Sequence, residues 1–517
     1  MEIFAYEPLG FDGFLVKIEV DIRRGIPAVD VVGLAAASVR ESRERVRAAI
    51  RNSRFEFPQD RVLINLSPAD LPKEGSQYDL PIALKILSTA GLIPDCGKQV
   101  LIVGELTLDG LVRPVRGTLP ALLQASRNGI RHFIVPEANY DEASRFRDGF
   151  LFPISRISEI QEILLAIRDG VERQMPLQRK CSEDSYASRL LEAKSDVDFS
   201  DYFGNETVVR ALVIAAAGRH NFLLFGPPGS GKTMAAARFP SLLPSLTEKQ
   251  AMEVAAIWSL QGQRYGEKQT CCRPPVCSPH HSASLEGIVG GGKPPRPGEI
   301  SLAHRGVLFL DEAPEFRRDV LQSLREPLEN GSISIVRAGR ILQYPADFQL
   351  VLAANSCPCG NLGNPAKACV CSPVEVQHYW KKMGGPLLDR IDMRIPVPVS
   401  SAANALGQPG QSQANLAKSV RRAVAIQMAR TAERGGVFNS RLPPELVRKH
   451  CQLSADANKL LRDKAEAIGL SMRACHSVLK IARTIADLQE SMLIDAQMIS
   501  EAAEYREYGD GDSYWPF

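Results

Sequence analysis

The chain has 517 residues, enough for about three domains at ~150 residues each. Its 44% hydrophobic and 23% charged residues are typical of a globular protein and exclude a collagen, a disordered tail protein and a polytopic membrane protein. The 62 basic and 59 acidic residues leave a net charge of +3, so any surface that binds nucleic acid must be local. No apolar run approaches the ~18 residues that span a bilayer, and the first residues show no signal peptide. We expect a cytoplasmic protein with no membrane partner.

Residues 1–175 are predicted to form a first domain in which strands and helices mix. Short apolar runs closed by Pro, Gly or Ser predict strands, and apolar segments that end at glycine predict helices. The expected strands are 62–68, 100–106 and 131–136, and the expected helices are 78–94 and 118–130. A polar segment without periodicity, 176–197, is expected to be a linker.

A stripe of arginines lies along one face of a further predicted helix in this domain, opposite an apolar face. The arginines that share this face are Arg40, Arg43, Arg47, Arg51 and Arg54. One interpretation is a solvated helix whose arginines pair with neighbouring glutamates. The other is contact with DNA phosphates, which we assign to Arg43 and Arg47.

A second domain is expected over 198–400, where apolar strands alternate with helices. The strands at 221–226, 306–312 and 348–355 are almost wholly apolar. Such strands, separated by helices, predict a parallel sheet that is covered on both faces.

A phosphate-binding loop follows the first of these strands. The segment GPPGSGKT matches the pattern G-x-x-x-x-G-K-[ST], with a strand before it and a helix after it. Its backbone N–H groups and the helix N-terminus favour phosphate, Lys232 is expected to reach the β- and γ-phosphates, and Thr233 to bind Mg²⁺. The expected ATP-binding residues are Gly226, Pro227, Pro228, Gly229, Ser230, Gly231, Lys232 and Thr233.

Polar side chains end the next two apolar strands. Asp311 is placed to hold Mg²⁺ and Glu312 to polarise the attacking water. Asn355, at the end of the following strand, is expected to orient the same water. The structural alternative is that the two acids only cap the next helix.

Four cysteines follow Asn355 in the pattern C-x-C…C-x-C. Residues i and i+2 of an extended segment point the same way, so each pair can present two thiolates to one ion. The four are Cys357, Cys359, Cys369 and Cys371. We expect a structural Zn²⁺ site, with reduced thiols as the alternative. A weaker second candidate cluster combines Cys271, Cys272 and Cys277 with His280 and His281.

The C-terminal part of the chain is expected to be helical. A segment rich in Gly, Pro, Ser and Gln, 401–416, is expected to be a second linker. Helices are predicted over 417–507, and 508–517 is expected to be a frayed tail.

The order of these motifs resembles AAA+ ATPases of the magnesium-chelatase/MCM branch, with LLDRID (387–392) and SMRAC (471–475) as further matches. The segments PHHSAS, PGEISLAHRGVLFLDEAPEF and NSCPCG resemble the ComM/YifB family more closely. This resemblance implies an α/β fold with a Lon-protease-like (ribosomal S5 domain 2-like) domain, an AAA+ core and a helical lid. It also implies branch-migration helicase activity on DNA.

The resemblance assigns roles to two arginines. Arg390 in LLDRID falls where this branch places an arginine finger that reaches ATP on the neighbouring subunit. Arg473 in SMRAC falls where a lid arginine contacts the γ-phosphate. A delocalised, permanently charged fork suits both roles, although each residue taken alone could be a surface ion-pair residue. An arginine that acts in trans requires an oligomer, and a homo-hexameric ring is implied.

Two segments are candidates for the ring pore. The alternating segment 332–345 predicts a hairpin with Arg337 and Arg340 near its tip, and such a hairpin projects into the pore in this branch. The glycine-rich segment 286–300 carries Lys293 and Arg296. An ordinary solvated hairpin is the alternative. The family's paired histidines, His280 and His281, have no role that the sequence reveals.

The segments PKEGSQYDL (72–80) and GELTLDGLVRPVRGTLPALLQASRNGI (104–130) resemble the proteolytic domain of Lon proteases, but they lack the residues of a peptidase. Lon chemistry requires a serine nucleophile and a lysine that removes its proton. The aligned positions hold Gln77 and Leu119, which can do neither, and the adjacent Ser76 would be aimed differently. We expect a DNA-facing or ring-forming platform.

The predicted function is therefore an ATP-driven DNA motor that moves branched or single-stranded junctions during recombination of incoming DNA in transformation. ATP, Mg²⁺ and structural Zn²⁺ are the expected cofactors, and forked or single-stranded DNA and a recombinase the expected partners. The alternative is a Mg-chelatase-type ATPase subunit or a regulatory AAA+ partner.

Overall fold

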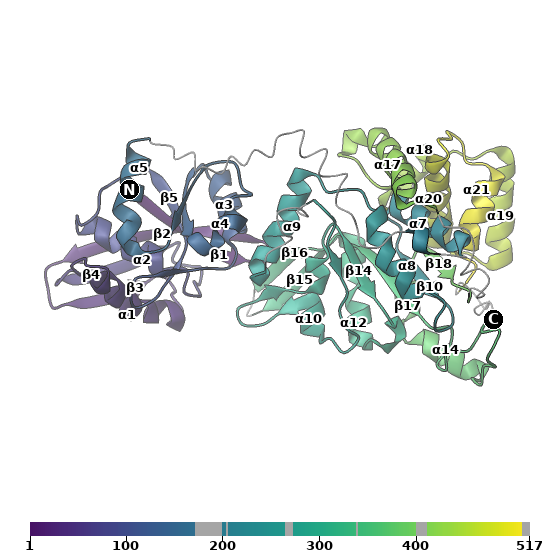
Figure 1. The fold of residues 1–517 in the computed structure, drawn as a ribbon, viewed down its shortest axis with the longest axis horizontal. Helices are drawn as coiled ribbons and strands as arrows, with labels where there is room; N and C mark the ends of the chain where they lie inside the picture. Colours follow the sequence, from purple (N-terminus) through teal and green to yellow (C-terminus); the bar gives the residue numbers. More distant parts are fainter. Residues whose placement is uncertain (171–198, 203–204, 264–271, 338–339, 400–410, 509–517) are drawn as a thin grey trace.

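A computed structural model of the protein describes residues 1–170, 199–202, 205–263, 272–337, 340–399 and 411–508. The expected linker at 176–197, Cys271, the hairpin tip at 338–339, the segment 401–410 and the tail from 509 lie outside the described residues. Figure 1 shows three successive units along the longest axis: the N-terminal domain, the central domain and the C-terminal helices.

The N-terminal domain is built on a mixed seven-stranded sheet of order β3-β4-β2-β1-β5-β8-β9. β1 pairs antiparallel with β2 and parallel with β5, so the expected mixture of strands and helices is confirmed. The strands are β1 (Glu2–Leu9), β2 (Asp12–Arg23), β3 (Ala28–Val32), β4 (Arg61–Ser67), β5 (Gln99–Ile102), β8 (His132–Pro136) and β9 (Phe150–Ile154), with a small ladder of β6 (Glu105–Leu106) and β7 (Val112–Arg113).

The helices of this domain cover the sheet with their apolar faces. In α1, Val39, Val46 and Ile50 are buried, as the helical spacing predicts. α2 is apolar on almost every side and is buried nearly throughout. The helices are α1 (Ala37–Asn52), α2 (Asp79–Thr89), α3 (Thr118–Arg127), α4 (Tyr140–Ala143) and α5 (Ile160–Arg168).

The central domain contains the expected parallel sheet, of order β11-β14-β17-β10-β18. Successive residues of a strand point to opposite faces, so Phe222 and Leu224 pack in one core while Leu223 and Phe225 pack in another. Both faces are therefore buried, which explains why the strands are almost wholly apolar. The strands are β10 (Phe222–Phe225), β11 (Val276–Cys277), β14 (Val307–Leu310), β17 (Gln349–Ala354) and β18 (Met393–Pro396).

Helices and two small hairpins complete this domain. The hairpins are β12 (Gly290–Gly291) with β13 (Arg296–Pro297) and β15 (Ser332–Arg337) with β16 (Arg340–Pro345). The helices are α7 (Glu206–Gly218), α8 (Lys232–Arg238), α9 (Glu248–Gln261), α10 (Leu285–Val289), α11 (Glu299–Leu302), α12 (Arg318–Ser323), α13 (Arg325–Asn330), α14 (Pro373–Lys381) and α15 (Gly385–Leu388).

The C-terminal unit is helical, as expected. Its helices are α17 (Gln413–Arg430), α18 (Pro444–His450), α19 (Ala455–Ile468), α20 (Met472–Leu488) and α21 (Ala496–Glu504). α17 begins inside the segment 401–416, which was expected to be a linker, because Leu416 and Val420 are buried in the core shared with α7. The helical unit thus packs directly on one face of the central domain.

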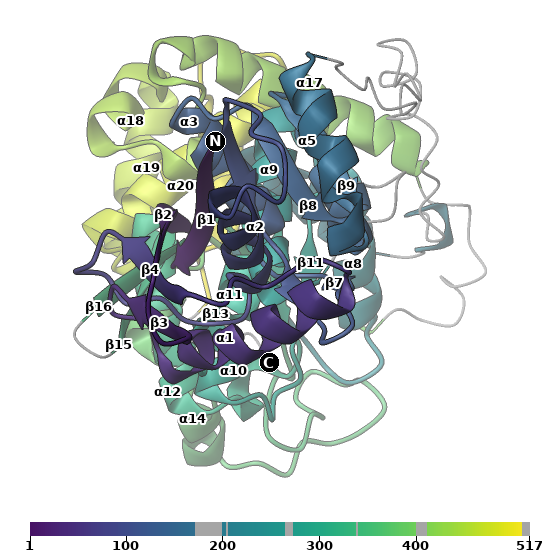
Figure 2. The same cartoon turned by 90° about the vertical axis from the view of Figure 1, so that its left-hand side faces the viewer.

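Two regions of the N-terminal domain, among others, contact the central domain. Leu119 is fully buried in a cluster with Leu246 and Val254 of the central domain. At the second place, the N–H of Phe11 in the β1–β2 turn donates to the carbonyl of Gln343 on β16 at 2.9 Å. When the molecule is viewed from the N-terminal end of its longest axis, the N-terminal sheet lies in front of the central domain (Figure 2).

Across the part of the chain that the structure describes, every helix is too short or too polar to cross a membrane.

Candidate nucleotide-hydrolysis site

The phosphate loop connects β10 to α8 with a backbone that requires glycine. Gly229 and Gly231 have φ angles of 76° and 91°, in the left-handed region. A Cβ on Gly226 would lie 2.2 Å from the carbonyl oxygen of Val397, so no larger residue fits there. Backbone conformation and close packing thus explain three of the glycines in the loop.

Lys232 lies buried within this loop. Its Nζ donates to the carbonyls of Gly226 at 2.8 Å and Pro227 at 2.9 Å, and to Oδ1 of Asn355 at 3.2 Å. Burial lowers the pKa of Lys232, and the charge of Asp311 opposes that effect. The structure therefore brings the lysine of the loop and the asparagine at the end of β17 into contact.

Thr233 and Asp311 meet on the same side of the sheet. The hydroxyl of Thr233 donates to Oδ2 of Asp311 at 3.0 Å. A hydroxyl and a carboxylate are oxygen donors of the kind that Mg²⁺ binds together with phosphate oxygens. This donor set fits the expected ion.

Glu312 follows Asp311 and has an unusual backbone. Its φ of 51° places a non-glycine residue in the left-handed region, and its N–H donates to Oδ1 of Asp311 at 2.9 Å. Oε2 of Glu312 lies 3.4 Å from Nδ1 of His281. The paired histidines are therefore neighbours of the expected catalytic acid, a contact that the sequence did not reveal.

Arg390 and the phosphate loop lie at opposite ends of two neighbouring parallel strands, β18 and β10. β10 and β18 are parallel neighbours, with Phe222 opposite Met393 and Phe225 opposite Pro396. The loop follows the end of β10, whereas Arg390 precedes the start of β18, and a strand of this length spans about 13 Å at ~3.3 Å per residue. The structure does not bring Arg390 to the phosphate loop of its own chain.

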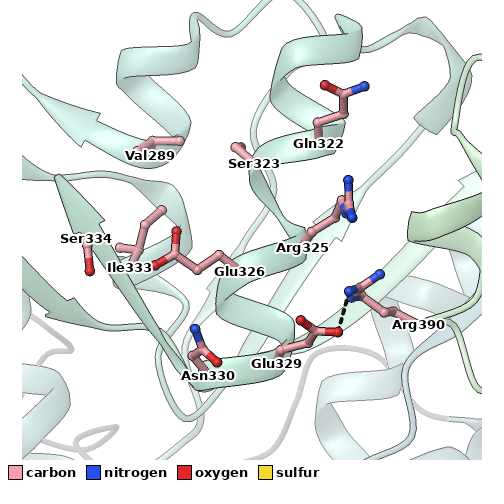
Figure 3. A pocket seen from close by; sticks show the side chains of 10 residues that line it. All are labelled: Val289, Gln322, Ser323, Arg325, Glu326, Glu329, Asn330, Ile333, Ser334 and Arg390. Atoms are coloured by element: carbon pink, nitrogen blue, oxygen red, sulfur yellow. Dashed lines mark hydrogen bonds and ion pairs between the residues drawn. The ribbon is translucent and has the colours of Figure 1, made fainter. Parts of the chain in front are cut away.

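Arg390 and Arg473 instead meet at Glu329, a residue that no sequence pattern marks. Arg390 donates to Oε1 of Glu329, and Nη1 of Arg473 lies 3.2 Å from the same atom. Burial opposes ionisation of Glu329, but Arg473 and Arg390 outweigh it and lower its pKa. Arg390, Glu329 and the exposed Arg325 line an open pocket of about 410 Å³ (Figure 3).

The four cysteines after Asn355 converge on one point. The Sγ of Cys357 lies 3.4 Å from that of Cys359 and 3.6 Å from that of Cys369, and the last two are 3.7 Å apart. All four sulfurs, including that of Cys371, lie within 4.8 Å of one another. Thiolates around a tetrahedral Zn²⁺ at ~2.3 Å would be about 3.8 Å apart, so the cluster fits such an ion.

The cysteine loop also contacts the phosphate loop. Gly360 has a φ of 78°, and a Cβ there would lie 2.7 Å from Cγ of Pro228. Backbone N–H groups of Asn361 and Val370 favour the thiolate of Cys359 and lower its pKa to about 6. The described residues of the second candidate cluster do not form a metal-binding group, and Cys277 is buried, which raises its pKa.

The two candidate pore segments contact one another through Arg337. Its Nη2 donates to Oε1 of Glu286 at 2.9 Å and its Nη1 to the carbonyl of Gly292 at 3.0 Å. Lys293 is exposed and Arg296 half-buried. Arg340 lies toward the N-terminal domain, where its charge acts on Glu7, although burial dominates and raises the pKa of Glu7 to about 8.

The arginine stripe of α1 is less uniform than its spacing predicts. Arg43 is exposed and lies 3.9 Å from Glu44, whereas Arg47 is half-buried over the ring of Phe57 at 5.7 Å. Arg54 lies beyond the C-terminal end of the helix and has a φ of 67°. These contacts leave Arg43 as the more accessible of the two residues expected to bind DNA.

The Lon-like positions hold no peptidase arrangement. The side-chain amide of Gln77 donates to the carbonyl of Glu74 at 2.7 Å, and the hydroxyl of Ser76 donates to Glu105. Leu119, at the lysine position, is buried against the central domain. The positions that align with the Lon serine and lysine therefore hold an amide and an aliphatic side chain.

An acidic residue that the sequence did not single out joins the helical unit to the central domain. Asp347 accepts from Arg441 at 3.1 Å, from Arg305 at 3.0 Å and from Arg219 at 3.4 Å. Burial opposes its ionisation, but the three guanidinium groups outweigh it and lower the pKa of Asp347 to about 2. An isolated acid in a loop carries no pattern by which it could have been found.

Comparison with known proteins accounts for nearly the whole chain. Three family models match, described as "Magnesium chelatase, subunit ChlI" over 198–405, "Subunit ChlI of Mg-chelatase" over 18–139 and "Magnesium chelatase, subunit ChlI C-terminal" over 410–506. A Lon protease of Rhizobium meliloti is 28% identical over 173 residues, which cover 31% of this chain and 21% of that protein.

Full-length relatives are more similar. Competence protein ComM of Haemophilus influenzae is 39% identical over 507 residues, covering 98% of this chain and 97% of that protein. The uncharacterized protein YifB of Escherichia coli is 42% identical over 503 residues, covering 96% of this chain and 95% of that protein. Since the likeness extends through all three units, the chain belongs to the ComM/YifB family of Mg-chelatase-like AAA+ proteins.

Proposed function

We propose that this protein is an ATP-hydrolysing motor that assembles as a homo-hexameric ring on DNA and drives branch migration during recombination of incoming DNA. The observation that carries the proposal is the position of Arg390. Arg390 lies at the end of the parallel strands that is opposite to Lys232 and Asp311. A second copy of the chain is therefore needed to complete a site that contains all three residues. The similarity to a competence protein supports the choice of DNA as the substrate.

Within one chain, the residues around the phosphate loop have distinct roles. The loop amides and Lys232 bind the phosphates of ATP, and Thr233 and Asp311 would hold Mg²⁺, which would neutralise phosphate charge. Glu312 orients the attacking water and accepts its proton, and Asn355 beside Lys232 orients the same water.

The neighbouring chain contributes charge stabilisation. Arg390, assisted by Arg473 of the helical unit, stabilises the negative charge that develops on the phosphoryl oxygens. Arg390 and Arg473 are paired with Glu329 in the isolated chain. When they bind the phosphate of the neighbour's ATP instead, hydrolysis is linked to the contact between subunits. Each step of ATP turnover then changes how two copies of the chain fit together.

The DNA contacts are assigned to basic groups on two domains. Arg337, Arg340, Lys293 and Arg296 of the central domain face the pore, and Arg43 and Arg47 of α1 add contacts from the N-terminal domain. Phosphate contacts of this kind are independent of sequence and weaken with salt. A recombinase is proposed as a further partner.

The cysteine cluster is proposed to hold one structural Zn²⁺. Four thiolates make a closed site with no position left for substrate. Because this loop contacts Pro228 and follows Asn355, the ion would stiffen one wall of the nucleotide site.

A second candidate function is a chelatase-type ATPase subunit or a regulatory AAA+ partner. The observation that favours it is the match of all three units to models of a magnesium chelatase subunit. Stimulation of ATP hydrolysis separates the candidates, since forked DNA activates the first and porphyrin-synthesis partners the second.

The experiment that tests the main proposal is a branch-migration assay on a synthetic four-way junction. With ATP, the intact chain should move the branch point and separate the junction into duplexes, whereas Lys232→Ala and Glu312→Gln should not. Failure of the intact chain to move any forked or four-way junction, with ATP hydrolysis indifferent to DNA, would contradict the proposal.

A further inference from the structure

The cysteine cluster holds a loop that has little else to fix it. Residues 361–371 form no helix or strand, and none of them is buried. Val370, between the last two cysteines, is 83% exposed. Because a segment without buried apolar side chains gains little from packing, the four sulfurs are the main restraint on the conformation of this loop.

Both ends of the loop are anchored beside the nucleotide site. Before the loop, Ser356 separates Asn355 from Cys357, and the indole N–H of Trp380 donates to the carbonyl of Ser356 at 3.1 Å. After the loop, Ser372 caps the N-terminus of α14, the helix that carries Trp380. The loop therefore connects the end of β17 with a helix that is bonded to the same strand end.

Two contacts connect the loop with the groups that are expected to hold phosphate. Gly360 packs on Pro228 of the phosphate loop so closely that a Cβ at position 360 would lie 2.7 Å from Cγ of Pro228. Asn355, two residues before Cys357, accepts a hydrogen bond from Nζ of Lys232 at 3.2 Å. A change in the loop would thus displace one wall of the nucleotide site and the residue expected to orient the attacking water.

The cysteines of the cluster differ in their accessibility. Cys357 is fully buried, whereas Cys359, Cys369 and Cys371 are partly exposed. The Sγ atoms of Cys359 and Cys369 are 3.7 Å apart, so a movement of roughly 1.6 Å brings them to the ~2.05 Å of a disulfide. These two thiols are therefore within reach of each other and of a small oxidant in solution.

We propose that the cysteine cluster is a redox switch for ATP hydrolysis, an inference that rests on the proposed zinc site and the proposed ATP hydrolysis but not on DNA. The oxidant is a hydroperoxide. One thiolate of the pair Cys359 and Cys369 attacks a peroxide oxygen, the O–O bond breaks, and a sulfenic acid and hydroxide form. The other thiolate attacks the sulfenic sulfur, so that the disulfide forms and a second hydroxide leaves.

Oxidation of this pair removes the restraint on the loop. Two thiolates have given up two electrons to one peroxide, and the cluster keeps only two of the four ligands that a closed zinc site requires. The cluster then releases Zn²⁺, and the loop no longer holds Gly360 against Pro228. ATP hydrolysis falls until a dithiol reduces the disulfide and the metal returns.

The first test titrates the zinc-loaded chain with hydrogen peroxide in the absence of DNA. Zinc release, followed with a chromogenic chelator, should reach one ion per chain. The kcat for ATP should fall about tenfold, because the attacking water is no longer held in position. A dithiol reductant with added Zn²⁺ should restore kcat. Release of zinc without loss of kcat, or loss of kcat before zinc is released, overturns the proposal.

The second test locates the oxidised pair. Mass spectrometry of the peroxide-treated chain should find the disulfide between Cys359 and Cys369. Cys369→His keeps a zinc ligand but removes the thiol, so this variant should retain zinc and keep its kcat at the peroxide dose that inactivates the intact chain. An equal loss of kcat in Cys369→His overturns the proposal. If the variant does not fold, the disulfide found in the intact chain still decides the pair.

A matched control removes the other cysteines that peroxide could reach. They are partly exposed or lie outside the described residues, and the control variant combines Cys181→Ser, Cys271→Ser, Cys272→Ser and Cys475→Ser. This variant should release zinc and lose kcat as the intact chain does. A control variant that resists peroxide would assign the response to cysteines outside the cluster and would overturn the proposal.

Failure of the switch and failure of the functions on which it rests give different results. A purified chain without zinc refutes the metal site and the switch together. If the chain does not hydrolyse ATP, the proposed motor fails, while calorimetry of ATP binding before and after peroxide still tests the switch. Weaker binding after oxidation would then support the switch, and unchanged binding would overturn it.

Discussion

Arg390 forms an ion pair with Glu329 on the edge of the central sheet that faces away from its own phosphate loop. Arg473, which belongs to the helical unit, reaches the same carboxylate at 3.2 Å. One acid therefore holds the two arginines that the family resemblance assigns to ATP hydrolysis, and it joins the helical unit to the central domain. In the proposed ring, the phosphate of ATP bound to a neighbouring chain would compete with Glu329 for both arginines.

We expect Arg390→Ala to lower kcat on the order of 10³-fold while ATP binding remains intact. In the proposed ring, the guanidinium acts on the nucleotide bound to the neighbouring chain and not on the nucleotide of its own chain. Nucleotide affinity measured by calorimetry and turnover measured with and without DNA check this.

Mixed assemblies give a sharper form of the same test. Lys232→Ala and Arg390→Ala are each expected to be inactive, yet a mixture should recover part of the activity, because some interfaces then combine an intact Lys232 with an intact Arg390. No recovery, together with equal loss of ATP binding by Arg390→Ala, would contradict a role in trans.

The cysteine cluster predicts one Zn²⁺ per chain. Replacing Cys359 and Cys369 by Ser should abolish the metal content and loosen the loop that contacts Pro228. Elemental analysis and thermal unfolding with and without chelator measure this, and Cys475→Ser is the control at a cysteine outside the cluster. Purified protein without zinc, whose stability is indifferent to chelator, would exclude the site.

The three arginines around Asp347 predict a dependence of stability on pH. The pKa of this carboxyl is lowered from 3.8 to about 2 in the folded chain, so its contribution is present above pH ~4 and is lost as the pH falls toward 2. Asp347→Asn should cost about 2 kcal/mol at pH 7 and about half of that near pH 3. Thermal unfolding at the two pH values, with the exposed Asp456→Asn as control, tests this; equal losses at both would contradict it.

Leu119 predicts the outcome of restoring a peptidase lysine. Leu119→Lys buries a charged group in the contact between the N-terminal and central domains, and an unpaired buried charge is strongly unfavourable. We expect no peptidase activity and separation of the two domains, measured as faster proteolysis between them. The exposed Leu108→Lys is the matched control. A stable, docked Leu119→Lys protein would show that this contact does not hold the domains together.

The arginines of α1 are tested by charge reversal. The double variant Arg43→Glu, Arg47→Glu should weaken DNA binding at low salt. The slope of log affinity against log salt concentration should become shallower by the amount that corresponds to about two phosphate contacts. Since Arg47 packs on Phe57, Arg43→Glu alone should account for most of the change. Arg24→Glu, elsewhere on the same domain, controls for net charge, and an unchanged salt slope would remove α1 from the DNA interface.

Features that depend on neighbours along the chain could be predicted from the amino-acid order alone. The phosphate loop is a contiguous pattern, the apolar strands of the central domain indicate burial on both faces, and the two C-x-C pairs indicate a metal site. The order of strands and motifs also predicted that Lys232 and Asn355 belong to one site, because the carboxyl ends of parallel strands meet at the same side of a sheet. In the structure the two side chains are in contact.

Contacts between segments far apart in the chain became visible only in the folded molecule. Glu329 and Asp347 are isolated acids with no local pattern, and their roles arise from arginines that the fold brings from other parts of the chain. Leu119 is an apolar residue like many others until the central domain covers it. His281 gains its meaning only beside Glu312, since the direction of a side chain is set by packing and by partners that periodicity does not encode.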